Sequence, residues 1–206
     1  MSVEARRPTV YLVDDDAEVR GAIEFLLAAE DLPVRSFDRP DAMLAALGPE
    51  HRGCLLLDVR LPGMDGLELH QRLTANGVTM PALFISGHGD IPMAVRAVNA
   101  GAMDFLEKPF DDTALLARIA RAFEHDAEHA RAALARAGLR ERLDSLTPRE
   151  RDVLDGIVAG RLNKQIADEL DISPRTVELH RGRVMEKLDA ANAADLVRRV
   201  LSLEDD

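Results

Sequence analysis

Two patterns of apolar and polar positions take turns along the first 124 residues. Short apolar runs predict β-strands, and the stretches between them carry apolar residues every three or four positions, which predicts helices. The predicted strands are Val10–Val13, Val34–Ser36, Cys54–Leu57, Ala82–Ile85 and Met103–Leu106. The predicted helices are Ala17–Ala29, Asp41–Leu47, Gly66–Ala75, Ile91–Ala100 and Asp111–Phe123. Repeated strand-helix units predict an α/β fold with a doubly wound, five-stranded parallel sheet, in which ligands bind at the carboxyl ends of the strands.

The helical pattern does not stop at Phe123. From Asp111 to Leu143 the sequence has no proline and only one glycine, Gly138, and apolar residues keep their helical spacing. The last helix of the sheet domain is therefore expected to continue into a helical linker over residues 125–144. Its Ala/Arg/Glu/His composition fits a solvated surface helix, while its apolar stripe fits a helix that pairs with a partner, and both interpretations stay open.

After Asp144 the pattern predicts helices alone. Thr147, Pro148 and Glu150 form a capping-box start, and Gly160 ends that helix. Further helices are expected over Asn163–Leu170, Pro174–Leu188 and Ala191–Leu203. The chain should therefore consist of a sheet domain (1–124), a linker (125–144) and a small four-helix domain (145–206).

The composition fits a globular protein of two small domains. The chain has 206 residues, 47% of them hydrophobic, and no apolar stretch approaches the roughly 18 residues that span a bilayer. We expect a cytoplasmic protein with no membrane contact. A single cysteine, Cys54, excludes an internal disulfide and a cysteine-based zinc site, and its apolar neighbours favour a core residue over a redox sensor.

Polar side chains follow several of the predicted strands. Asp14 and Asp15 follow the first strand, Asp58 the third, Ser86 the fourth and Lys108 the fifth. Taken singly, Asp58 fits a helix cap or loop residue, and the acidic residues fit a solvated loop. Together they should meet at one edge of the sheet, where converging carboxylates favour a hard divalent cation, best Mg²⁺. Such a carboxylate, with an ammonium and a hydroxyl beside it, can accept a phosphoryl group.

These positions resemble the response-regulator receiver family over roughly Pro8 to Phe123, a CheY-like fold. The matching segments are residues 13–16, 57–66, 85–90 and 104–110. The resemblance implies that Asp58 is the phosphoacceptor. It also implies that Asp15 and Asp58 bind Mg²⁺ with the backbone carbonyl of Arg60, and that Asp14 assists through water.

The resemblance implies roles for further residues of this domain. Ser86 stands where many members have threonine, and keeps the hydroxyl that contacts the phosphoryl group. Phe105 matches an aromatic switch residue, although the sequence fits a plain core phenylalanine equally well. Arg60 and His88 match positions that flank the path of the hydrolytic water, where control of the phosphoryl lifetime is expected, and the Lys108-Pro109 bond is expected to be cis.

The segment 163–177 reads as helix, four-residue turn and helix, with apolar residues at the joint. A helix-turn-helix presents its second helix to the major groove of DNA. The net charge of the whole chain, −11, argues against DNA binding, and residues 146–206 carry ten basic and thirteen acidic side chains. Residues 173–187 reverse the balance, with four basic and two acidic side chains, so the basic charge is concentrated on the second helix. A purely structural helical hairpin would not need this charge.

The C-terminal segment resembles the LuxR/FixJ-type DNA-binding domain over Leu143 to Leu201, on the motifs at residues 146–154, 163–167 and 173–180. The resemblance implies that Glu178, Leu179 and Gly182 face bases, with Arg181 able to compensate for the missing side chain at Gly182. It implies phosphate contacts for Lys164, Thr176, His180, Arg183 and Lys187.

The whole sequence thus resembles a FixJ/NarL-type response regulator. This predicts a transcription factor, not an enzyme, that a sensor histidine kinase phosphorylates on Asp58, with dimerisation and promoter binding favoured by phosphorylation and RNA polymerase as a further partner. Two alternatives stay open. One is an aspartyl-phosphate hydrolase, which the absence of a cap domain disfavours, and the other is a phosphorylation-gated regulator that binds a protein and has lost DNA binding.

Overall fold

The structure is a computed structural model that describes residues 7–87 and 91–203. The chain divides into two compact units, residues 1–130 and 131–206, and each is described by itself. Helix α5 (Asp112–Asp144) begins in the first unit and ends in the second. The continuous helix predicted from the uninterrupted pattern after Asp111 is therefore present.

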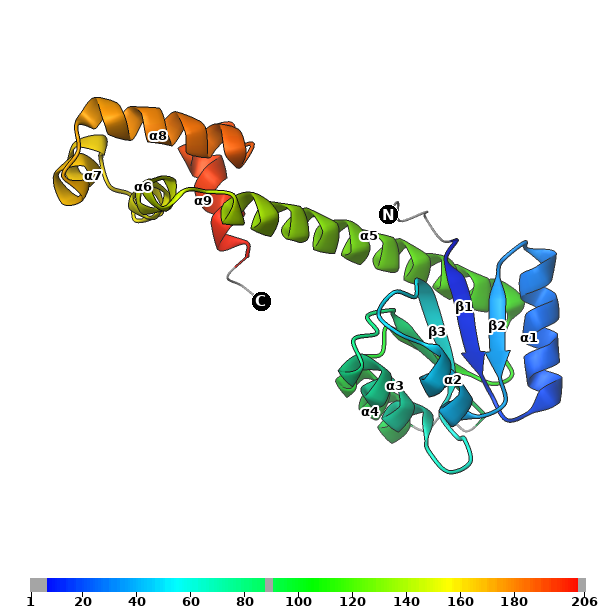
Figure 1. Ribbon diagram of the computed structural model, residues 1–206. Coiled ribbons are helices and arrows are strands. Elements are labelled where there is room, and N and C mark those ends of the chain that lie inside the picture. The colour runs from blue at the N-terminus through cyan, green and yellow to red at the C-terminus, as the bar shows by residue number, and fades with distance from the viewer. Residues whose placement is uncertain (1–6, 88–90, 204–206) are drawn as a thin grey trace. The chain divides into compact units, whose positions relative to one another are not determined.

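A five-stranded parallel sheet forms the centre of the first unit, in the order β2-β1-β3-β4-β5 (Figure 1). The strands are β1 (Thr9–Val13), β2 (Val34–Phe37), β3 (Gly53–Asp58), β4 (Ala82–Ser86) and β5 (Asp104–Glu107). All pairs of neighbouring strands are parallel. The doubly wound α/β fold predicted from the sequence is confirmed, and β1 and β3 lie at its centre, where the strand order reverses.

Helices cover both faces of this sheet (Figure 1). They are α1 (Ala17–Ala29), α2 (Pro40–Ala46), α3 (Gly66–Ala75) and α4 (Ile91–Asn99), with the first turns of α5. One apolar core lies between the sheet and α2, α3 and α4, and the other between the sheet, α1 and α5. Because both faces of β3 are buried, its apolar run is continuous, and Cys54 is a fully buried core residue.

Within the described part of the second unit, up to residue 203, four helices follow α5. They are α6 (Pro148–Val158), α7 (Asn163–Leu170), α8 (Pro174–Lys187) and α9 (Ala193–Leu201). Helix α6 begins with the predicted capping box, in which the Thr147 side chain accepts from the Glu150 amide and the Glu150 carboxylate accepts from the Thr147 amide. The all-helical domain predicted for the C-terminal part is confirmed.

The joint between α7 and α8 is apolar, as the sequence predicts. Ile166, Ala167, Val177 and Val184 are buried in one core cluster, and further residues of α6 and α9 complete it. Asp171 adopts a left-handed conformation (φ 53°) after α7, which turns the chain toward α8. The two helices of the predicted helix-turn-helix are therefore held by a shared core.

Candidate functional site

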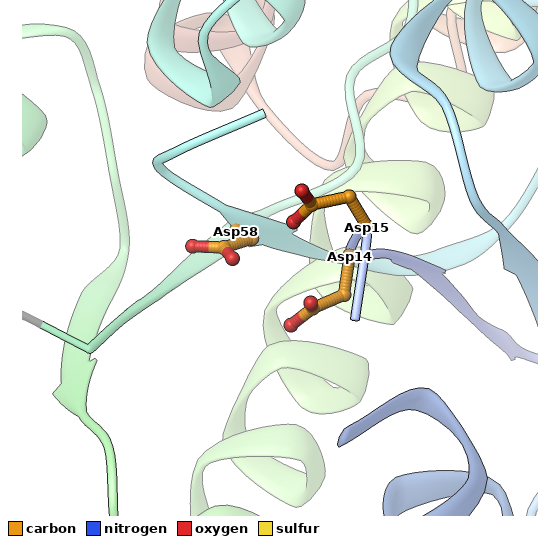
Figure 2. A group of neighbouring side chains, drawn as sticks. All are labelled: Asp14, Asp15 and Asp58. Atoms are coloured by element: carbon orange, nitrogen blue, oxygen red, sulfur yellow. The ribbon is translucent and has the colours of Figure 1, made fainter. Parts of the chain in front are cut away.

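Three carboxylates meet at the carboxyl ends of β1 and β3. Figure 2 shows Asp14 and Asp15 directly after β1 and Asp58 as the last residue of β3. One carboxylate oxygen from each lies within 4.8 Å of the others. Asp14 is fully buried and Asp58 is 7% exposed, whereas Asp15 is exposed. The three residues that the sequence predicts at this edge are thus brought together, with access for a ligand beside Asp15.

The backbone around Asp58 determines where its carboxylate lies. The amide of Val59 donates to the Ile85 carbonyl (3.0 Å), which extends the sheet pairing past the end of β3. A Cβ atom at Gly66 would lie 2.1 Å from the Asp58 carbonyl oxygen, so only glycine allows α3 to begin this close to β3. Asp65 is the N-cap of α3, so Asp58 is not the helix cap that its sequence context alone also allows.

Lys108 links two of the carboxylates. Its Nζ donates to Oδ2 of Asp14 (2.5 Å) and to Oδ2 of Asp58 (3.1 Å). Its backbone amide donates to the Ser86 carbonyl (2.8 Å), which places the residue at the end of β4. The Lys108-Pro109 bond is cis, as expected from the resemblance.

Burial and charge shift the titration of this group in opposite directions. Burial raises the pKa of Asp58 above its ordinary range, and the nearby charge of Asp14 adds to the rise, although Lys108 opposes it. Burial opposes the charge of Lys108, but its hydrogen bond to Asp14 and the charges of both carboxylates outweigh it, so the pKa of Lys108 is raised. One ammonium thus faces more negative charge than it can neutralise.

The residues of this site fit a divalent cation. Carboxylate oxygens are the ligands that hard cations such as Mg²⁺ prefer, and a cation relieves the repulsion between converging carboxylates. The amide of Arg60 donates to Oδ1 of Asp58 (3.2 Å), so the chain turns closely around Asp58. Asp14, Asp15 and Asp58 are consistent with a metal site, which the structure does not assign to a particular ion.

The remaining predicted residues of the first unit take different positions. Ser86 is fully buried and ends β4, next to β3. Phe105 is half-buried on β5 and packs against the core under α3 and α4. Arg60 is exposed beside Asp58, and His88 lies outside the described residues.

One neighbour of the site was not predicted. The guanidinium of Arg20, on α1, donates to the Asp14 backbone carbonyl (2.7 Å). Arg20 follows the acidic run Asp14 to Asp16 by one helical turn, and this spacing could have indicated a contact. The contact holds the loop after β1 from the side of α1.

Helix α8 presents a continuous exposed face. Exposed residues recur at positions 175, 178, 179, 182 and 183, opposite the buried Val177 and Val184. Leu179 is 55% exposed, although leucine is usually buried, and a Cβ at Gly182 would meet open space. The three residues predicted to face bases, Glu178, Leu179 and Gly182, thus lie together on this face.

The residues predicted to contact phosphates are not all equally available. Lys164 and Arg183 are exposed, and Arg181, which is expected to compensate for Gly182 and not to contact phosphate, is half-buried. Thr176 is half-buried, and its hydroxyl lies 2.8 Å from that of Ser173. Lys164 and Thr176 lie in the first turns of α7 and α8, where helix dipoles favour anions, whereas Arg181 and Arg183 lie in the second half of α8.

Two other predicted phosphate contacts have surroundings that the sequence did not indicate. Lys187 donates to Oε2 of the buried Glu150 (2.7 Å) and to the Ser145 carbonyl (3.1 Å). Nδ1 of His180 is buried and has no hydrogen-bond partner within residues 7–87 and 91–203. A phosphate at Lys187 would therefore compete with an existing ion pair.

Comparison with known proteins identifies both parts of the chain. Residues 10–120 match the response regulator receiver domain, and residues 144–200 match the bacterial regulatory proteins of the luxR family. The chain belongs to the response regulator family. This response regulator therefore combines a receiver with a LuxR-type helix-turn-helix domain that binds DNA, and it is a FixJ-like transcription regulator, not a conventional enzyme.

Relatives of this response regulator match along almost its whole length. It is 45% identical to the transcriptional regulatory protein FixJ of Bradyrhizobium diazoefficiens over 189 residues, covering 92% of both chains. It is 44% identical to FixJ of Rhizobium meliloti, covering 94% of this chain and 95% of that one. It is 42% identical to the response regulator TodT of Pseudomonas putida, covering 97% and 88%.

Solved structures agree with this classification. The response regulator StyR is 44% identical with a TM-score of 0.81, covering 95% of this chain and 99% of that chain. Full-length FixJ from B. japonicum is 43% identical with a TM-score of 0.59, covering 97% and 98%. In the part of the chain that the structure describes, no helix is both long and apolar enough to cross a membrane.

Proposed function

We propose that this response regulator is phosphorylated on Asp58 by a sensor histidine kinase and then binds promoter DNA through α8. The contact of Lys108 with both Asp14 and Asp58 carries the first part of the proposal, because it places a cation beside the acceptor carboxylate. The exposed face of α8, with Leu179 and Gly182, supports the second part.

The proposed reaction forms an acyl phosphate. A carboxylate oxygen of Asp58 attacks the phosphorus of a phosphohistidine, the phosphorus–nitrogen bond breaks, and the released imidazole of the kinase takes up a proton. Lys108 would neutralise charge on the equatorial oxygens, and the Ser86 hydroxyl would donate to the product. Ser86 and Phe105 would then change position together as the switch.

We propose Mg²⁺ as the ion, held by Asp15, Asp58 and the backbone carbonyl of Arg60, with Asp14 acting through water. When bound, Mg²⁺ would neutralise carboxylate charge and share phosphoryl oxygens with the protein. The geometry that supports this set is the approach of three carboxylate oxygens within 4.8 Å.

Dimerisation would connect phosphorylation to DNA binding. Residues 146–206 carry a net charge of −3, so a single DNA-binding domain would make few favourable phosphate contacts. Joining two such domains raises the effective concentration of the second one at adjacent half-sites. In this proposal residues 1–124 form the receiver, 125–144 the linker and 145–206 the DNA-binding domain. The protein acts in the cytoplasm on promoters, together with RNA polymerase.

A mobility-shift experiment with genomic fragments tests the proposal. The wild-type chain should bind DNA at least about tenfold more tightly with beryllofluoride and Mg²⁺ than without. Asp58→Asn should lose both this response and acid-labile phosphorylation, whereas Asp38→Asn, which removes an exposed carboxylate after β2, should keep both.

Two results would contradict the proposal. Retained labelling in Asp58→Asn would place the acceptor elsewhere. Beryllofluoride-dependent change in the receiver without DNA binding in either state would favour the regulator that binds a protein partner instead.

A further inference from the structure

A second ion pair of the first unit lies at the opposite end of β3 from Asp58. Arg52 precedes β3, and its guanidinium contacts Oδ2 of Asp126 on α5 at 3.1 Å. The same guanidinium donates to the backbone carbonyl of Asp126. The amide of Gly53, the first residue of β3, donates to Oδ2 of Asp126 (3.0 Å). Arg52, Gly53 and Asp126 are called the β3–α5 clasp below.

Asp126 is a charged residue at a buried position of α5. Its side chain is 4% exposed, and its Oδ1 has no hydrogen-bond partner within residues 7–87 and 91–203. Burial raises the pKa of Asp126, while the Gly53 amide and the Arg52 charge oppose the rise. A buried carboxylate is costly unless it is paired, so its position depends on the contacts with Arg52 and Gly53.

The backbone of Gly53, whose amide makes one of these contacts, is held in a fixed conformation. Its φ of +132° is a conformation that other residues rarely adopt, and a Cβ there would lie 2.0 Å from the Thr9 carbonyl oxygen. Thr9 begins β1, and its amide donates to the Arg52 carbonyl (3.1 Å). The clasp thus joins α5 to the two central strands of the sheet.

The place of the clasp along α5 suggests its role. The apolar contacts of α5 with the sheet include Ile119, Ala122 and Phe123, and Asp126 lies one turn later. The first unit ends at Ala130, four residues after Asp126. From Glu124 to Gly138 the helix has an Ala/Arg/Glu/His composition with little to bury, before Leu139 and Leu143 pack on the core of the second unit. Such a segment depends on tertiary contacts to stay helical.

We propose that Arg52 and Asp126 are positioning residues that hold the start of the linker helix on the receiver sheet. The β3–α5 clasp keeps α5 helical and in place after its apolar contacts end. A change in the receiver then reaches the linker through a stiff helix. This second step rests on the phosphorylation-dependent DNA binding proposed above.

Hydrogen exchange of the full-length chain tests the positioning role directly. Arg52→Gln and Asp126→Asn should each speed amide exchange over residues 124–130 by at least about tenfold, because each leaves the clasp incomplete. Arg121→Gln is the matched control. It removes one positive charge from an exposed position of the same helix and should exchange like the wild type.

Mobility shifts with and without beryllofluoride test the coupling in the same variants. The affinity gain caused by beryllofluoride should fall about tenfold in Arg52→Gln and Asp126→Asn, while phosphorylation of Asp58 by acetyl phosphate stays at the wild-type level. A purely structural contact would leave this gain unchanged. Arg52 is partly exposed, so Arg52→Gln provides a folded variant if Asp126→Asn is unstable.

Two results would overturn the inference. Unchanged exchange over residues 124–130 in both clasp variants would show that the clasp does not hold the helix. Faster exchange with an unchanged beryllofluoride gain would show that the held helix does not transmit the change. If the wild type itself shows no gain, the proposed function fails, and the exchange experiment still decides the positioning role.

Discussion

Lys108 in the receiver and Lys187 in the DNA-binding domain are both held by carboxylates, but their surroundings differ in charge balance. Lys108 contacts two carboxylates, Asp14 and Asp58, whereas Lys187 pairs with one carboxylate of the described residues, that of Glu150. A one-to-one pair is electrically complete and joins α6 to α8. The group around Lys108 has more carboxylates than ammonium ions and therefore keeps a net negative charge. This charge can attract a divalent cation, and a reaction at one of the carboxylates can reduce it.

The pKa values of Glu150 and Asp58 are shifted in opposite directions, in line with this difference in charge balance. The hydrogen bond from Lys187 and the capping contacts with Thr147 lower the pKa of Glu150 to about 2. Burial, aided by the Asp14 charge, raises the pKa of Asp58 despite its contact with Lys108. Ionisation is therefore favourable for folding at Glu150 and unfavourable at Asp58.

The largest effect is expected from removing one carboxylate of the group Asp14, Asp15 and Asp58. Asp15→Asn should weaken Mg²⁺ binding by about 100-fold, because it replaces a charged carboxylate of the proposed ligand set with a neutral amide. Isothermal titration calorimetry of the full chain measures this affinity. Asp38→Asn is the control, and equal affinities of the two variants would remove Asp15 from the ligand set.

Breaking the balanced pair should destabilise the second unit by about 2 kcal/mol. Glu150→Gln leaves Lys187 without its counter-charge and weakens the cap of α6. Calorimetric unfolding of the full chain should show the loss in the transition of the second unit alone. Glu186→Gln changes a neighbouring exposed carboxylate and should have little effect. Equal stability of both variants would mean that the Lys187 pair adds nothing to folding.

The stability that Glu150 contributes should depend on pH in a defined direction. Its pKa falls from 4.5 to about 2 on folding, so its contribution is fully present above pH 4.5 and is lost as the pH falls toward 2. The difference in unfolding free energy between wild type and Glu150→Gln should therefore be constant from pH 7 to about 5 and shrink below. If this difference in unfolding free energy grew as the pH fell, the assigned direction of the Glu150 pKa shift would be wrong.

The smallest expected effect is a gain in the stability of the receiver when the carboxylate of Asp58 is removed. Because the pKa of Asp58 is raised on folding, its ionised form costs stability as the pH rises above its ordinary range. Asp58→Asn should therefore stabilise the receiver by about 1 kcal/mol at pH 7 in chelator. Saturating Mg²⁺ should cancel this advantage by stabilising the wild type. Thermal unfolding with and without Mg²⁺ measures both terms, and a destabilised variant in chelator would contradict the assigned cost.

Local patterns predicted the elements and the edge of the sheet on which Asp14, Asp58 and Lys108 lie. This succeeded because strand ends in a parallel sheet meet at one edge, whatever the packing of the rest. The ion pair of Glu150 with Lys187 joins residues 37 apart and was not predicted. Sequence spacing carries no information on which side chains two packed helices bring together, so Lys187 was assigned only to DNA.

The β3–α5 clasp was missed for the same reason, and with an added difficulty. Asp126 lies in a charged stretch of α5 and looks like an ordinary solvent-facing residue of a polar helix. Its burial follows from the close approach of the Gly53 backbone, 73 residues earlier. Only the folded chain reveals that this carboxylate lies against the sheet.

The contact between Gly66 and the Asp58 carbonyl restricts how this protein can vary. Alanine, the smallest replacement, would place its methyl carbon 2.1 Å from the Asp58 carbonyl oxygen, so every substitution must push β3 and α3 apart. In a library of all single substitutions selected for promoter output, position 66 should tolerate as few alternatives as position 58 itself. A residue without a functional group would thus be as intolerant of replacement as Asp58, the proposed acceptor, because the space that Gly66 leaves free determines where Asp58 lies.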